Sequence, residues 1–141
     1  MVSHWTKTAA AIAAGTMLAA GLLPAQRAEA ARIENRVAVF SGIDKITGRI
    51  TTFDVYIDET VQFGALQVTP RVCYTRDETE APKTTTFVEV DEITLDRKIR
   101  RIFTGWMFAD SPALNAVEHA VYDVWLDTCK MESDVPPPAE G

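Results

Sequence analysis

The sequence has little of what catalytic and metal-binding proteins commonly use. It holds two histidines and two cysteines in 141 residues. Cys73 and Cys129 are too far apart for a Cys-x-x-Cys redox motif, and with His119 they make an incomplete ligand set for zinc. No glycine-rich phosphate loop and no calcium-binding loop is present. We therefore expect no bound metal, no cofactor and no thioredoxin-like redox activity.

A block of basic residues is also missing, and the overall charge is negative. The chain has 14 Lys and Arg against 20 Asp and Glu, a net charge of −6. An acidic chain without a basic cluster is a poor partner for nucleic acid or for anionic membrane surfaces, so we expect neither. Aromatic and β-branched residues are plentiful enough to build a core, which argues against wholesale disorder.

The first 30 residues have the composition of a secretory signal peptide. Lys7 gives a positive start, residues 8–23 form an apolar run, and a proline ends that run. Ala28-Glu29-Ala30 supplies the small-x-small pattern before a cleavage site, so we predict cleavage after Ala30 and a periplasmic protein. The apolar run is short for a spanning helix, which needs about 20 residues. We expect no membrane span after cleavage; an uncleaved N-terminal anchor is the alternative.

The remaining residues suit one small domain. We predict a single β domain at residues 31–132, because neither an internal repeat nor a linker divides this part of the chain. Residues 133–141 contain three consecutive prolines, and we predict a disordered proline-rich tail there.

The export signal also bears on the two cysteines. An even cysteine number in an oxidising compartment predicts a disulfide between Cys73 and Cys129, although two buried free thiols are the alternative. The bond would close a loop of 56 residue steps. The loop-entropy model gives such a bond roughly 4 kcal/mol of stabilisation.

Short alternating runs dominate the predicted domain. In residues 49–57, apolar Phe53, Val55 and Ile57 alternate with polar residues, which is the period-2 pattern of a half-buried strand. Pro70 interrupts a similar run and cannot donate to a ladder, so its strand is expected at an edge or with a bulge. We predict about seven short strands, at residues 36–43, 49–57, 61–64, 66–74, 84–90, 102–108 and 121–126.

Two segments lack a strand pattern. Residues 91–101 are rich in charge and have few apolar positions, so we predict a charged loop there rather than a short helix. Ser111 followed by proline is a helix-start signal, which predicts a short helical turn from Pro112 to Val117. The predicted fold class is all-β, a small antiparallel sandwich or partly closed barrel. If the strand register holds, Cys73 faces away from Tyr74.

His119 is the natural candidate for catalysis, with acidic residues close to it in the sequence. No nucleophile motif accompanies it, because Ser111 lacks the glycine-flanked setting and is better explained as a helix cap. We therefore predict no catalytic residue, and a structural His119 that joins the strand of Cys129 to the preceding turn. The alternative is a small hydrolase-like enzyme that uses His119.

Two groups of residues are candidates for binding. Trp106, Tyr122 and Trp125 would suit an aromatic platform for sugars or peptides, although their β spacing also suits core residues. Lys45 and Arg49 lie in the DKITGR segment, whose Asp start and Gly end predict an exposed hairpin loop. A solvated turn without a partner is the alternative for that hairpin.

Four longer blocks resemble one bacterial family. They read GIDKITGRITTFDV, FGALQVTPRVCYTR, FVEVDE and GWMFADSPALNAVEHAVYDVWLDTCK, and lie within residues 37–130. The cysteine spacing, the Lys-x-Thr-Gly hairpin and the Ser-Pro pair match as well. The chain resembles the family catalogued as domain of unknown function 2155. This resemblance implies an exported protein of Gram-negative bacteria, with no established activity.

We therefore predict a periplasmic, non-enzymatic structural or interaction domain of the cell envelope. Its expected partner is an envelope protein or a cell-wall or glycan component.

Overall fold

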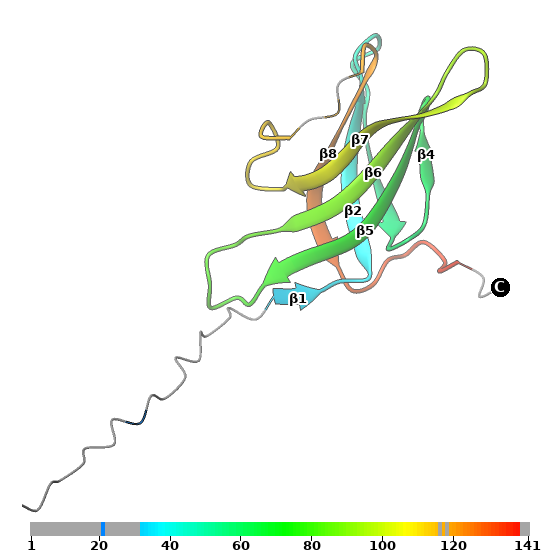
Figure 1. Cartoon of the computed structure of the whole chain (residues 1–141). Coiled ribbons are helices and arrows are strands. Elements are labelled where there is room, and N and C mark those ends of the chain that lie inside the picture. Colours follow the sequence, from blue (N-terminus) through cyan, green and yellow to red (C-terminus); the bar gives the residue numbers. More distant parts are fainter. Residues whose placement is uncertain (1–20, 22–31, 116, 118, 139–141) are drawn as a thin grey trace, which may run out of the picture.

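The computed structural model describes residue 21 and residues 32–115, 117 and 119–138. The signal peptide predicted for residues 1–30 therefore lies outside the described residues, apart from Gly21. Within the described part, the chain forms eight strands and no helix, which confirms the all-β prediction (Figure 1). The strands are β1 (Arg32–Glu34), β2 (Val37–Asp44), β3 (Ile50–Tyr56), β4 (Val61–Phe63), β5 (Leu66–Arg76), β6 (Thr85–Ile93), β7 (Ile99–Phe108) and β8 (Tyr122–Lys130).

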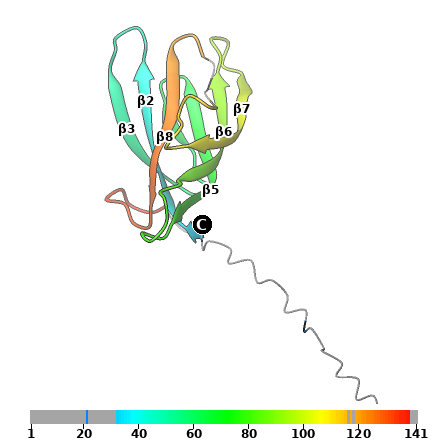
Figure 2. The same cartoon turned by 90° about the vertical axis from the view of Figure 1, so that its left-hand side faces the viewer.

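The strands form two antiparallel sheets. The three-stranded sheet has the order β3-β2-β8, and the five-stranded sheet has the order β1-β5-β6-β7, with β4 pairing the first part of β5. The two sheets pack against each other with their strands crossing, which gives a partly curled sandwich (Figures 1 and 2).

The core lies between the inner faces of the two sheets. Phe40 and Leu126 of the three-stranded sheet are paired neighbours and are fully buried. Val88 and Val90 of β6 face them from the five-stranded sheet and are also fully buried. Glu89, the β6 residue between them, lies on the opposite face, because successive side chains of a strand alternate.

The two cysteines join the sheets. Cys73 lies on β5 and Cys129 on β8, their Cα atoms are 5.7 Å apart, and their sulfurs lie at bonding distance. Cys73 is buried in the core while Tyr74 is on the outer face, as the alternation predicts. This geometry agrees with the predicted pairing.

Pro70 lies at an irregularity of β5, as expected. The pairing register between β5 and β6 shifts between Pro70 and Val72. The absence of an N–H in proline explains the break in the ladder. The prediction of a bulge at this position is therefore confirmed.

The prediction of a charged loop at residues 91–101 is wrong. β6 extends to Ile93 and β7 begins at Ile99, so this segment is a hairpin with a short turn. Charged side chains are tolerated in these strands because they meet opposite charges across the pair. Arg100 Nη2 lies 2.8 Å from Glu92 Oε2 in this way.

The prediction of a helical turn from Pro112 to Val117 is also wrong for the residues that the structure describes. The segment forms turns, with the amide of Leu114 donating to the carbonyl of Ser111 at 3.0 Å. Asn115 Nδ2 donates to the carbonyl of Trp106 at 2.6 Å and so ties the segment to β7. Leu114 of this segment is 66 % exposed, while Val117 at its end is buried in the core.

The segment after β8 runs along the three-stranded sheet as far as Pro138. Tyr56 Oη donates to the carbonyl of Val135 at 2.6 Å, and Ser133 Oγ donates to Asp54. Lys130 Nζ lies 2.6 Å from the same carboxylate. Burial raises the pKa of Asp54, but the hydrogen bonds from Lys130 and Ser133 outweigh it and hold that pKa below its ordinary value.

Candidate functional site

The outer face of the five-stranded sheet carries an unusual number of rings. Phe87 alternates with buried Val88 and lies on this face, beside Trp106 of the neighbouring strand. Their rings meet edge to face, with centroids 5.4 Å apart. Tyr74 of β5 stacks on Trp106 from the other side of β6, at 6.1 Å between centroids. Trp106 is 39 % exposed, so a large indole is left in contact with solvent.

Tyr74 and Trp106 border a shallow cavity of about 310 Å³, which we call the aromatic pocket. Volumes of this order are at the lower end of those of small-ligand sites. Its lining residues are Arg32, Tyr74, Arg76, Lys83, Thr85, Trp106 and Phe108.

The charge of the aromatic pocket opposes that of the whole chain. Its three charged lining residues are the cations Arg32, Arg76 and Lys83, in a chain of net charge −6. The guanidinium of Arg32 lies 4.5 Å from the centre of the Tyr74 ring, which is cation–π geometry. A local group of cations on an acidic domain attracts anions to that place. The arrangement suits a ligand with both a flat apolar surface and negative charge.

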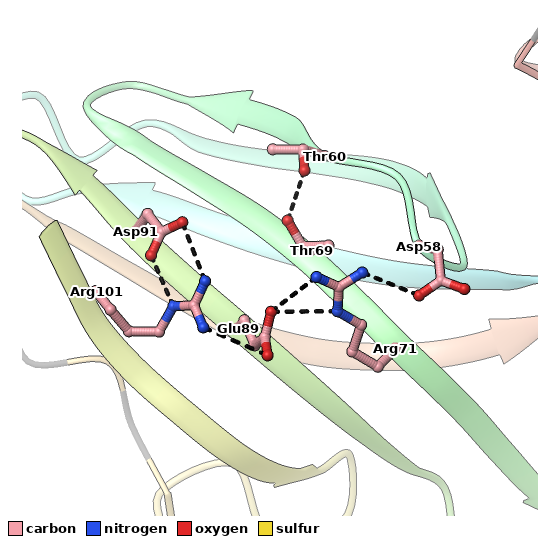
Figure 3. Close-up of polar contacts among 7 residues, drawn as sticks. All are labelled: Asp58, Thr60, Thr69, Arg71, Glu89, Asp91 and Arg101. Atoms are coloured by element: carbon pink, nitrogen blue, oxygen red, sulfur yellow. Dashed lines mark hydrogen bonds and ion pairs between the residues drawn. The ribbon is translucent and has the colours of Figure 1, made fainter. Parts of the chain in front are cut away.

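Next to the aromatic pocket, the same face carries an ion-pair ladder across β5, β6 and β7 (Figure 3). Glu89 lies at its centre, with one oxygen 3.0 Å from Arg71 Nη2 and the other 3.4 Å from Arg101 Nη1. Arg71 also contacts Asp58 at 3.0 Å, and Arg101 contacts Asp91 at 2.8 Å. Both arginines of the ladder are thus shared between two carboxylates.

These contacts favour the charged form of each arginine. Hydrogen bonds to Asp58 and then to Glu89 raise the pKa of Arg71 above its ordinary value. A hydrogen bond to Asp91 raises the pKa of Arg101. The ladder therefore neutralises its own cations.

A second cavity, of about 360 Å³, lies near the C-terminal segment. It is lined by residues from the β1–β2 region and β3, together with Pro138. Glu34 and Arg36 give this lining mixed charge, and no tryptophan faces it. It lacks the combination of stacking ring and single-sign charge that distinguishes the aromatic pocket.

The predicted binding residues are not brought together. Trp106 lines the aromatic pocket on the five-stranded sheet. Tyr122 of β8 is half-buried and meets the ring of Phe63 edge to face at 5.6 Å. Trp125 pairs with Ser41 and lies on the outer face of the other sheet. Trp106 and Trp125 thus lie on the outer faces of different sheets, and Tyr122 packs against the core, so the three rings do not form one platform.

Lys45 and Arg49, the candidates in the β2–β3 hairpin, do not line the aromatic pocket. Lys45 Nζ contacts Asp123 at 2.9 Å and donates to the carbonyl of His119 at 2.8 Å, so it ties the β2–β3 hairpin to the start of β8. Arg49 is exposed, and within the described residues no partner contacts its side chain. Of these five binding candidates, Trp106 alone lines the aromatic pocket.

His119 is held by the backbone of the strand that follows it. Its Nδ1 accepts hydrogen bonds from the amides of Val121 and Tyr122, at 3.0 and 3.2 Å. Nδ1 is therefore unprotonated, and Nε2 is the ring donor to Glu92 Oε1 at 3.3 Å. Arg100 holds the pKa of Glu92 below its ordinary value, and His119 acts in the same direction. This geometry agrees with the expected role of joining the preceding turn to the strand of Cys129.

The described residues offer no group of three or more His, Cys, Asp or Glu side chains that would hold a metal ion. The same part of the chain contains no helix with the length and hydropathy that crossing a bilayer requires.

Most residues that line the aromatic pocket were not predicted from the sequence. The expected strands pass through Tyr74 and Phe108, but Lys83 lies in a loop and Arg32 in a strand that was not predicted. The pocket exists because β6 lies between β5 and β7, which places Tyr74 and Phe108 on either side of Thr85 and Trp106 beside Phe87. Alternation assigns residues to faces, but it does not give the order of strands in a sheet.

Comparison with known proteins gives a family and no individual relative. Residues 38–129 match the family model described as an uncharacterized protein conserved in bacteria, domain of unknown function 2155. No curated protein matches the chain, and no solved structure matches it. The family match includes most of the described strands, from β2 to the disulfide on β8. The chain belongs to this family of bacterial proteins.

Proposed function

We propose that this protein is an exported, non-enzymatic binding domain of the bacterial cell envelope. It contacts its partner through the outer face of the five-stranded sheet. The observation that carries the proposal is the aromatic pocket, where a 39 % exposed tryptophan lies beside three cations on an acidic chain. Exposed aromatic residues with positive side chains around them are typical of recognition surfaces.

The location of His119 supports binding rather than hydrolysis. His119 does not line the aromatic pocket, and both of its ring nitrogens contact protein groups. A general base needs a ring nitrogen that can reach the proton of a nucleophile. Export is supported by the apolar N-terminal run and by the cysteine pair at bonding distance.

Site-specific photo-crosslinking in the living bacterium tests the proposal. A photoreactive residue at Thr104 samples the outer face of the five-stranded sheet, because Thr104 is exposed and lies two residues before Trp106. The matched control is Thr128, an exposed threonine of β8 on the other sheet. We expect a discrete adduct from position 104, in the periplasmic fraction, and none from position 128.

Three outcomes contradict the proposal. One is a protein that stays in the cytoplasmic fraction with residues 1–30 still attached. The second is equal crosslinking from the two threonine positions, which indicates random contact. The third is turnover of a substrate by the folded wild-type protein that His119→Ala abolishes without loss of folded protein.

A further inference from the structure

We infer that the aromatic pocket binds an anionic glycan, a saccharide whose ring stacks on Trp106 and whose carboxylates pair with Arg32 and Lys83. The inference rests on the proposed function and names the class of ligand.

The exposed ring indicates a ligand with a flat apolar surface. Trp106 is fixed from two sides, by Tyr74 at 6.1 Å and by Phe87 at 5.4 Å between centroids. A ring held in this way loses little rotamer freedom on binding, so stacking on it costs little entropy. The C–H face of a sugar ring matches such a surface, while its hydroxyl groups stay in contact with water in a shallow pocket.

The cations indicate negative charge on the ligand. Arg32, Arg76 and Lys83 approach the pocket from β1, the end of β5 and the loop before β6. Arginine pairs with carboxylates through two parallel hydrogen bonds, which gives direction as well as charge. The arginines of the adjacent ladder are already bound to Glu89 and its neighbours (Figure 3). Arg32 and Lys83 carry positive charge at the aromatic pocket, so an anion is attracted there.

The backbone around the pocket argues against an extended peptide as the ligand. Thr85 lies in β6, whose two sides are paired with β5 and β7, so a peptide cannot add as a strand there. β7 lies at the end of the sheet, and there the carbonyl of Trp106 is already occupied by Asn115 Nδ2 at 2.6 Å, so this backbone acceptor is not available to a peptide. Recognition at this place therefore depends on side chains, as stacking and carboxylate pairing do.

Titration calorimetry on the oxidised mature protein tests this inference. The first probe is the hexamer of galacturonic acid, and its methyl ester provides the same rings without charge. We expect the acid to bind, to bind more weakly as salt is added, and to bind better than the ester. A second titration with soluble muropeptides, whose carboxylates belong to lactyl and peptide groups, shows which source of carboxylate binds more tightly.

Matched variants locate the binding. Trp106→Ala and Lys83→Glu should each weaken binding about tenfold or more, because a stacking ring or a charge partner is lost. Trp125→Ala removes an indole from the other sheet, and Lys98→Glu reverses a charge on the distant β6–β7 turn, where Lys98 is 81 % exposed. Both control variants should bind as the wild type does.

The inference is overturned if neither anionic saccharide binds, or if the methyl ester binds as tightly as the acid. Equal binding of hexaglutamate, which carries the charge without the rings, would replace the glycan with an acidic peptide. If position 104 gives a crosslink but no saccharide binds, the proposed binding function still holds and only the proposal of a glycan ligand is wrong.

Discussion

Close contacts around two glycines hold Tyr122 and Phe63 in the interior. A Cβ atom at Gly64 would lie 2.4 Å from the Tyr122 ring, and one at Gly42 would lie 2.6 Å from Phe63. Gly64 also has φ +56°, a conformation that other residues rarely adopt. The rings meet edge to face because both glycines leave space for them. Tyr122 therefore contributes to packing, although its strand spacing equally suits a surface residue.

The first prediction concerns a single residue, His119. His119→Ala should lower the free energy of unfolding by about 1–3 kcal/mol, because two half-buried amides lose their acceptor. His119→Asn places a side-chain oxygen near the position of Nδ1, so it should recover part of that loss. Denaturant unfolding of the three proteins measures the difference. Equal stability of His119→Ala and wild type would show that the ring is not structural.

At the scale of strands, the sequence predicts those strands in which apolar and polar residues alternate, because one face is buried and the other is not. The run at residues 49–57 alternates clearly, and β3 occupies Ile50–Tyr56. Residues 91–101 escaped prediction because their strands are stabilised by opposite charges across the pair. Arg101 meets Asp91 at 2.8 Å, and this pairing appears only once the register is known.

The ladder at the centre of the five-stranded sheet gives the second prediction. Glu89→Gln should cost about 1 kcal/mol at low salt, because Arg71 and Arg101 lose the carboxylate they share. The loss should shrink as salt is added, since screening weakens exposed ion pairs. Glu78→Gln, in the exposed loop before β6, is the control with the same change of side chain. An unchanged unfolding midpoint for Glu89→Gln at low salt would show that the ladder does not stabilise the sheet.

At the scale of the molecule, sequence and structure agree on class and differ on arrangement. Strand patterns and turn signals are local, so they predicted an all-β chain with an edge strand or a bulge at Pro70, and the structure has the bulge. The sheet order β1-β5-β6-β7 depends on contacts between distant segments, and so does the aromatic pocket that it creates. Trp106 was identified because a tryptophan is conspicuous in any sequence. Arg32 and Lys83 became candidates only through their position around the pocket.

The link between the two sheets gives the last prediction. Cys73 and Cys129 connect β5 to β8 across a separation of 56 residues, and the loop-entropy model gives such a bond roughly 4 kcal/mol. Replacing both cysteines by serine should therefore lower the free energy of unfolding by about 2–4 kcal/mol, because the unfolded chain regains freedom and two buried positions become polar. Denaturant unfolding with and without a reductant measures this loss. The reductant should destabilise the wild type and leave the double variant unchanged. If the wild-type midpoint does not respond to the reductant, and alkylation finds two free thiols in protein taken directly from the bacterium, the bond does not form in the cell.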